Sequence, residues 1–273
     1  MRRAFRAIAA SLLLVACGDD DGRAAPGIDA GEPDLGGTPR DGGLGSDGSV
    51  GDGTGDSGAA GACVFEERFD EDATTWPASW SIAGGVAVAD VVGGRGRLVP
   101  VTSDYALARM FVPLVGCVDA EVTFRFEMTD GSSQGIGVYL RQNGGHLQRT
   151  EPPGSGYAVF IEAFRAPEGI GVWHELDGVE RAIEPIEPLA IDPGVVYRAR
   201  FRLTQTDAST TTLQARAWRD DESEPSSWQV ERTDRTPSLQ GRSGGLAIDA
   251  YSARTSGAAA DLFVDDVVVT AMP

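Results

Sequence analysis

The regular alternation of apolar and polar residues limits what this chain can fold into more than any other feature. Residues 121–128 read E-V-T-F-R-F-E-M, so the four apolar side chains would share one face of an extended strand. The same alternation returns in residues 195–203 and 211–219. A period of two with polar residues on the opposite face is typical of strands that bury only one side.

Other segments have strand composition, and none shows the apolar stripe of a helix. The dipeptide Asp177-Gly178 lies between two of them and predicts a hairpin with a two-residue turn. About ten short strands in some 210 residues predict an all-β sandwich of two antiparallel sheets. The further strands are expected at 64–69, 105–112, 136–142, 157–164, 169–176, 179–183, 245–251 and 262–270.

The N-terminus has the layout of a bacterial export signal. Three arginines precede a short apolar run, 8–15, that is too short to span a bilayer. The run ends in Leu14-Val15-Ala16-Cys17, which resembles the lipobox of bacterial lipoproteins. The sequence thus predicts a lipoprotein signal peptide over 1–16 and a lipid on Cys17. Gly18 favours the outer membrane by enterobacterial sorting rules, with the rest of the chain periplasmic or surface-exposed.

Residues 17–62 would form a tether between the lipidated cysteine and a folded domain at 63–273. They are almost wholly Gly, Asp, Ala, Ser, Thr and Pro, so they cannot bury a core and should be disordered. Ten acidic residues against two arginines give this linker a net charge of −8, and their repulsion should extend it. A linker of this length could hold the domain roughly 35 Å or more from the membrane.

The charge of the chain excludes some classes of partner. The total is −18; the linker contributes −8 and the signal +3, so the domain carries −13. Such a charge argues against nucleic acids and anionic lipid headgroups as partners. The membrane would be reached only through the lipid. Two His and three Cys leave little material for a zinc site, and we expect no required cofactor.

The cysteines predict one disulfide. Lipid would consume the thiol of Cys17, which leaves Cys63 and Cys117. Export would place both in an oxidising compartment, so we expect them to be bonded.

Short motifs follow one another between residues 64 and 271: Phe69-Asp70, Trp76, Trp80, Tyr139, Tyr157, Trp173, Asp177-Gly178, Ala217-Trp218, Glu224-Pro225, Ser227-Trp228-Gln229 and Val264-Asp265-Asp266-Val267. In this order they resemble the concanavalin A-like lectin/glucanase family, which includes laminin-G-like modules. The resemblance implies a jelly roll, but the family contains lectins, binding modules and hydrolases, so it does not determine the function.

Alternate residues of a strand lie on the same face of a sheet, and this alternation puts aromatic and hydrogen-bonding residues that could bind a ligand on one face. The resemblance implies that the sheet bearing them carries the ligand; the alternative is that several only pack beneath loops. We expect a surface-displayed, lipid-anchored binding module for a polysaccharide or an envelope or extracellular partner, rather than an enzyme. The residues that could share this outer face are Tyr139, Arg141, Phe160, Glu162, Trp173, Glu175, Asp249 and Tyr251.

A glycoside hydrolase acting on a β-glucan-like polysaccharide is the alternative. Residues 175–180 match the E-x-D-x-x-E signature of glucanases that the chain resembles, where Glu175 and Glu180 would act as nucleophile and acid and Asp177 would tune protonation. A retaining pair needs carboxyls about 5–5.5 Å apart in one cleft. That requires a continuous strand, whereas Asp-Gly predicts a turn.

The resemblance also implies a structural calcium ion, with Asp265 of the V-D-x-V pattern as one ligand. Parity places Asp265 on the side of Val267, toward the core. A buried carboxylate there would need a metal or hydrogen bonds. The alternative is an irregular edge strand whose carboxylates both reach water.

Overall fold

The computed structural model describes residues 63–102, 106–254 and 257–272. These residues form sixteen strands and two single-turn 3₁₀ helices, η1 (Leu147–Arg149) and η2 (Pro237–Leu239). The predicted signal peptide, Cys17 and the tether lie outside the described residues. No helix in the described part of the chain is long and apolar enough to cross a membrane.

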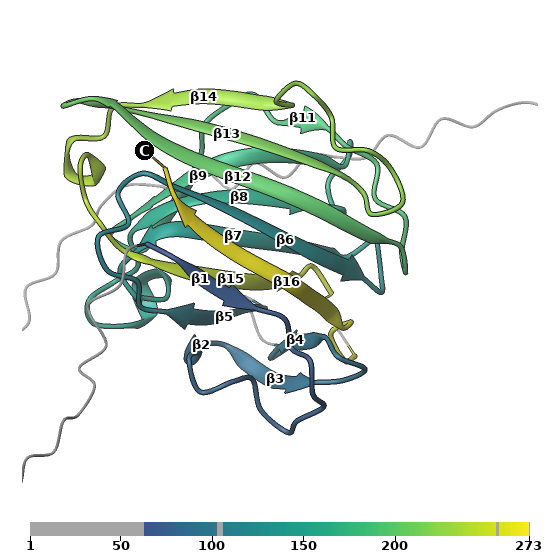
Figure 1. Ribbon diagram of the computed structural model, residues 1–273. Coiled ribbons are helices and arrows are strands. Elements are labelled where there is room, and N and C mark those ends of the chain that lie inside the picture. The colour runs from purple at the N-terminus through teal and green to yellow at the C-terminus, as the bar shows by residue number, and fades with distance from the viewer. Residues whose placement is uncertain (1–62, 103–105, 255–256, 273) are drawn as a thin grey trace, which may run out of the picture. The chain divides into compact units, whose positions relative to one another are not determined.

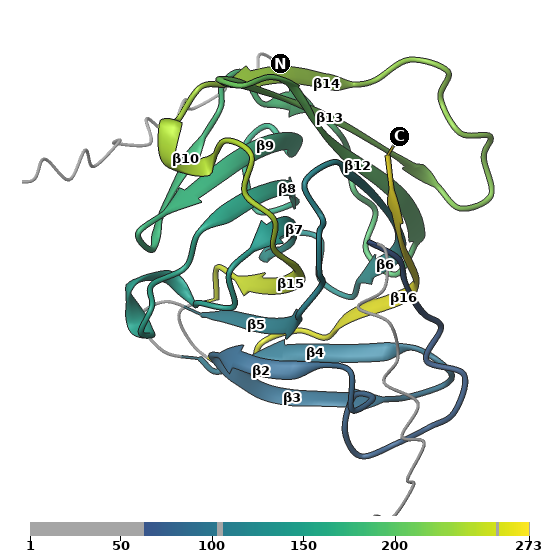
Figure 2. The ribbon, with the colours of Figure 1, turned by 60° about the vertical axis from the view of Figure 1, so that its left-hand side comes forward.

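Two antiparallel sheets pack face to face (Figures 1 and 2), which confirms the predicted all-β sandwich. Sheet A has the order β14 (Val230–Asp234), β13 (Thr210–Arg219), β12 (Val196–Asp207), β6 (Ala120–Met128), β16 (Leu262–Ala271), β4 (Gly96–Pro100) and β3 (Val86–Val91), and β1 (Phe65–Glu67) pairs with β16. Sheet B has the order β10 (Val179–Ala182), β9 (Gly169–Leu176), β8 (Gly156–Glu162), β7 (Gln134–Gln142), β15 (Gly245–Ser252), β5 (Leu107–Val112) and β2 (Ser81–Gly84), and β11 (Glu187–Pro188) pairs with β9.

The apolar side chains of the alternating segments form the core between the two sheets. The apolar residues of β6, among them Phe124 and Phe126, are buried, as are Phe201 of β12 and Val138 and Val159 of sheet B. Burying each such side chain stabilises the fold by about 1.5–3 kcal/mol. Their polar neighbours in β6, β12 and β13 face outward from sheet A, so each strand keeps the register that the pattern requires.

The sequence prediction missed the short strands β2, β3, β4, β11 and β14. Strands β2, β3 and β14 lie at sheet edges, and the residues of β2 and β3 are mostly half-buried rather than alternately buried and exposed. Because an edge strand with two partly wet faces has no strict period of two, the pattern does not reveal it.

The predicted disulfide is confirmed. Cys63 and Cys117 are bonded, with their Cα atoms 4.9 Å apart. The bond joins the residue two positions before β1 to the loop that leads into β6. Closing a loop of this length contributes about 4 kcal/mol in the chain-entropy account.

Strand β16 contains a bulge that changes the expected position of Asp265. Its register against β6 shifts between Asp265 and Val268, and Asp266 has a φ of 46°. The extra residue lets Val264 and Val267 both point inward. Asp265 is half-buried on the outer side, where it accepts a hydrogen bond from the Asp266 N–H at 2.8 Å.

The parity argument that motivated a calcium site at Asp265 is therefore wrong, because this carboxylate does not point into the core. Within the described residues, no three His, Cys, Asp or Glu side chains come together in a group that could hold a metal ion.

Candidate functional site

The segment 175–180 forms the predicted hairpin. Asp177 and Gly178 have φ values of 51° and 74°, and Val179 pairs with Leu176 across this two-residue turn. Both left-handed positions suit a type I′ turn, and Asp177 is exposed at its tip. The E-x-D-x-x-E match therefore does not run along one strand. Glu175 and Glu180 instead lie opposite each other in β9 and β10.

Both glutamates contact a buried arginine of β5. We call Arg109, Asp249, Glu175 and Glu180 the Arg109 cluster. The guanidinium holds Asp249 through two hydrogen bonds of 2.7 Å, and its Nη1 donates to Glu175 at 2.7 Å. Nη2 reaches Glu180 Oε1 at 3.3 Å. The side chains of Arg109, Asp249 and Glu175 are fully buried, whereas that of Glu180 is 14% exposed.

Neighbouring strands of sheet B bring this cluster together. Arg109 and Asp249 are directly opposite in the pairing of β5 with β15. Tyr139 of β7 stacks on the guanidinium, with 4.4 Å between Arg109 Cζ and the ring centroid, and its hydroxyl donates to Glu180. Gly137 lies between Asp249 and Phe160 in the sheet, and a Cβ there would lie 2.6 Å from the Phe160 ring. The missing side chain lets that ring lie across β7.

Burial raises the pKa of Glu180 to about 7. The negative charges of Asp249 and Glu175 act in the same direction, while the hydrogen bond from Tyr139 and the charge of Arg109 oppose the shift. Burial also raises the pKa values of Glu175 and Asp249. One guanidinium shared by three carboxyls cannot compensate all of them fully, because each carboxylate has lost its hydration.

Glu175 fastens the loop between β7 and β8. Its Oε1 accepts a hydrogen bond from the Leu147 N–H at 3.0 Å, and its Oε2 accepts one from the Gln142 side chain at 2.8 Å. Arg109 donates to the carbonyl of Gly145 in the same loop at 2.8 Å. Glu175 therefore positions η1, which this loop carries, and its own carboxylate does not reach solvent.

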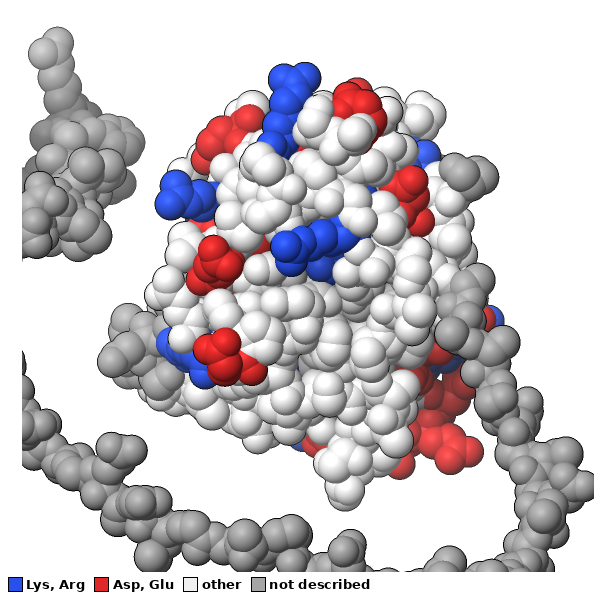
Figure 3. Space-filling model, turned by 90° about the vertical axis from the view of Figure 1, so that its left-hand side faces the viewer, with Lys and Arg blue, Asp and Glu red and all other residues white. Residues whose placement is uncertain are grey.

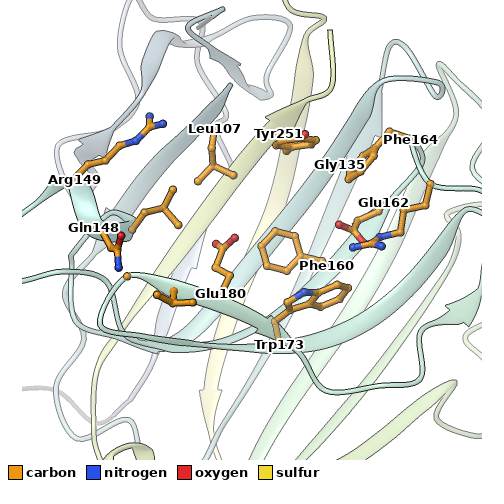
Figure 4. A pocket seen from close by; sticks show the side chains of 14 residues that line it. Leu107, Gly135, Gln148, Arg149, Phe160, Glu162, Phe164, Trp173, Glu180 and Tyr251 are labelled. Carbon is orange, nitrogen blue, oxygen red and sulfur yellow. The ribbon is translucent and has the colours of Figure 1, made fainter. Parts of the chain in front are cut away.

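A cavity of about 700 Å³ opens above the cluster, on the outer face of sheet B (Figure 4). Phe160 and Trp173 form part of its wall in an edge-to-face pair with centroids 5.0 Å apart, and Tyr251 packs on Phe164 at 4.7 Å. The residues that line it are Leu107, Gly135, Leu147, Gln148, Arg149, Phe160, Glu162, Phe164, Arg165, Trp173, Gly178, Val179, Glu180 and Tyr251.

Two acidic side chains reach this cavity from different strands. Glu180 comes from β10 and Glu162 from the end of β8, and Figure 4 shows the Phe160 ring between them. Glu162 is held by Arg165, and burial raises its pKa. Aromatic walls beside carboxyl groups can hold a ligand that offers both apolar faces and hydrogen-bonding groups.

The structure places seven of the eight expected ligand residues on the outer face of sheet B. Four of them, Phe160, Glu162, Trp173 and Tyr251, line the cavity. Tyr139, Glu175 and Asp249 are buried beneath it.

Arg141 is the exception, and its expected place on this face is wrong. It has a φ of 56°, which turns its side chain toward sheet A, where it donates to the Val118 carbonyl at 2.7 Å and to Thr211 at 3.0 Å.

The sequence reasoning missed Arg109 and the loop residues of the cavity. The sequence could have indicated the role of Arg109. A charged residue inside the apolar run L-A-R-M-F-V is buried on either face of the strand, so it must have polar partners. No sequence pattern indicates that the loop residues Leu147, Gln148 and Arg165 line the cavity, because loops show no periodicity.

Comparisons with known proteins bear on the fold. No family model matches the chain, and no curated protein matches it either. Among solved structures, the alginate lyase Aly36B superposes with a TM-score of 0.51 at 10% identity, over 77% of this chain and 98% of that one. The fold is a jelly-roll β-sandwich of two antiparallel sheets.

Two further structures are similar at lower scores. A putative β-glucanase from Mycobacterium abscessus has a TM-score of 0.49 at 16% identity, covering 76% of this chain and 100% of its own. The lectin UEA-II, complexed with galactose, has a TM-score of 0.47 at 12% identity, covering 76% and 98%.

Proposed function

We propose that this chain is a lipid-anchored, non-catalytic module that binds polysaccharide in the cavity on sheet B, displayed from the bacterial envelope. The cavity carries this proposal. Its volume of about 700 Å³ is large enough for a small ligand or for a short stretch of a polymer. Phe160, Trp173 and Tyr251 offer rings for the apolar faces of sugars, and Glu162 and Glu180 offer acceptors for hydroxyl groups.

The arrangement of acidic groups favours binding over hydrolysis. In the alternative, Glu175 and Glu180 would cleave a β-glucan-like polysaccharide, and the pKa of about 7 for Glu180 would suit a general acid. Both carboxyls of a hydrolytic pair must reach the substrate. Glu175 is fully buried and bonded to Arg109, Gln142 and the Leu147 N–H, so it cannot attack a sugar.

The binding proposal is tested with the full-length chain on an array of bacterial, plant and animal glycans. We expect binding to at least one polysaccharide, and Trp173→Ala should weaken it at least about tenfold, because a large aromatic side chain in such a cavity contributes strongly. Trp228→Ala is the matched control, since Trp228 packs against Arg202 and Arg216 on sheet A. Binding to a protein partner but to no glycan would contradict the proposal. Release of reducing ends from a bound polysaccharide would favour the hydrolase.

The anchor is tested by metabolic labelling of cells with a palmitate analogue. The wild-type chain should incorporate the label and Cys17→Ser should not, because the acyl chains are carried by a diacylglyceryl group joined to the Cys17 sulfur as a thioether, and serine offers no thiol for that bond. The matched control is Gly18→Ser, which should leave labelling intact. Label on the Cys17→Ser chain would show that the lipidation assignment is wrong.

A further inference from the structure

The Arg109 cluster has more negative than positive groups. Asp249 and Glu175 take the 2.7 Å contacts with the guanidinium, and Glu180 is left with the longest one, 3.3 Å. Of the three carboxyls, Glu180 alone lines the cavity. The group whose charge Arg109 compensates least is thus the one that a ligand can touch.

Most of the groups that sheet B brings to Glu180 are neutral or negative. Tyr139 of β7 donates a neutral hydroxyl, while Asp249 of β15 and Glu175 of β9 add negative charge. Across the cavity, Arg165 is held by Glu162. Arg149 of η1 also lines the cavity, at its rim in Figure 4.

The wider charge distribution also favours a cation over an anion as the ligand group. The domain carries −13 of the total charge of −18. On the side seen in Figure 3, acidic and basic side chains are interspersed and form no continuous basic patch. Such a surface repels a polyanion, whereas a cationic ligand is attracted both over distance and at Glu180.

From this imbalance we propose that the cavity selects saccharides with a free amine, such as glucosamine oligomers, and that Glu180 binds the sugar ammonium. The inference rests on the proposed function, because Trp173 and Phe160 would contact the sugar ring while the Glu180 carboxylate pairs with the ammonium group on it. A carboxylate buried beside two others is stabilised when a ligand brings the counter-charge.

The ionisation of Glu180 gives this recognition a pH signature. Burial raises its pKa to about 7, so below that pH the group is mostly neutral and attracts an ammonium weakly. Affinity for an amino sugar should therefore be greatest near pH 7, because Glu180 gains its proton at lower pH and the sugar ammonium loses its proton at higher pH. Affinity for a neutral sugar should lack this maximum.

Calorimetry with the full-length chain and three tetrasaccharides on one β-1,4 backbone tests the inference. The position-2 substituent is an ammonium in tetra-glucosamine, an acetamide in its N-acetylated form and a hydroxyl in cellotetraose. We expect tetra-glucosamine to bind about tenfold more tightly than the neutral pair near pH 7, where part of its amines and part of the Glu180 carboxyls are ionised. Glu180→Gln, which keeps an acceptor for Tyr139, should remove that preference. Glu231→Gln on β14 is the matched control and should keep it.

The outcomes separate this inference from the proposed function. If neutral saccharides bind in a Trp173-dependent manner and the ammonium brings no preference, the cavity binds glycans and the inference is overturned. A preference that survives Glu180→Gln in a folded variant also overturns it. If none of the three tetrasaccharides binds and no polysaccharide on the glycan array binds either, both the inference and the proposed function are overturned.

Discussion

The Arg109 cluster and the arginine ladder on the outer face of sheet A use the same residue types in opposite environments. We define the ladder as Arg198, Arg200 and Arg202 of β12, with Glu121, Asp220 and Glu224 as partners. Its arginines are 25–40% exposed, whereas the Arg109 side chain is fully buried. In the ladder, three arginines meet three carboxylates, and of these six groups only Glu121 is buried. In the cluster, three carboxyls share one cation.

The difference shows how burial, rather than residue type, separates a stabilised surface from a site. Exposed ion pairs gain little because water already solvates both partners. Buried ions lose hydration, and removing one partner leaves the others uncompensated. We therefore expect mutations in the two regions to differ in size, in pH dependence and in salt dependence.

The largest effect should come from Arg109→Met. The variant keeps an apolar stem but leaves Glu175, Glu180 and Asp249 without their cation, so we expect a loss of about 3–5 kcal/mol in the free energy of unfolding. Urea denaturation followed by tryptophan fluorescence measures it. Protonation of the orphaned carboxyls should recover part of the loss at pH 5. A loss below about 1 kcal/mol would show that the cluster behaves like the ladder.

An intermediate effect should appear in the pH dependence of stability. Because the pKa of Glu180 is raised to about 7 in the folded state, the folded chain holds this proton more tightly than the unfolded one. Its contribution is fully present below about pH 4 and is lost as pH rises through 7, by at most about 3 kcal/mol. Glu180→Gln should remove this contribution, so the free energy of unfolding should differ less between pH 5 and pH 8 in the variant than in the wild-type chain.

The ladder provides the control of opposite sign. Burial acts to raise the pKa of Asp220, but its hydrogen bonds from Arg198 and Arg125 outweigh burial and lower it. Its contribution is therefore present above the ordinary Asp value and is lost as pH falls. Asp220→Asn should reduce stability at pH 7 and change it little at pH 3. If the free energy of unfolding of this variant and of Glu180→Gln changed with pH in the same way, the ladder and the Arg109 cluster would not differ in their pH dependence as proposed.

The smallest effect should come from Arg200→Met. This arginine pairs with Glu121 and with Glu224, the latter at 2.7 Å, and its side chain is 25% exposed. We expect a loss of at most about 1 kcal/mol that shrinks further in 0.5 M salt, because salt screens exposed charges. The measurement is urea denaturation at two salt concentrations. A larger, salt-insensitive loss would mean that Glu121 depends on Arg200 as the buried carboxyls depend on Arg109.

The alternation of residues along the strands was sufficient for the central strands and for the face taken by seven of the eight expected ligand residues, four of which line the cavity. Wherever a strand is regular, as β8 and β9 are, counting by two places Phe160 and Trp173 on the same face of sheet B. The Asp177-Gly178 turn was equally predictable, because few dipeptides adopt two left-handed conformations in succession.

Parity failed where a single residue departs from extended geometry. Arg141 and Asp266 both have positive φ, which turned Arg141 toward sheet A and moved Asp265 to the outer side of β16. Neither conformation is written in the residue pattern. The role of Glu175 was also beyond the pattern, since its partner Leu147 lies 28 positions away in a loop.

The disulfide has a mechanical consequence for a domain held from its N-terminal side. Strand β1 is three residues long and pairs with β16, so a pull on the chain would unzip it one residue pair at a time. The bond from Cys63 to Cys117 diverts that force before it reaches β1. The pull passes instead toward β6, which is hydrogen-bonded on both sides by β12 and β16. A load applied ahead of Cys63 would thus enter the fold beside one of the central strands of sheet A rather than at its short β1.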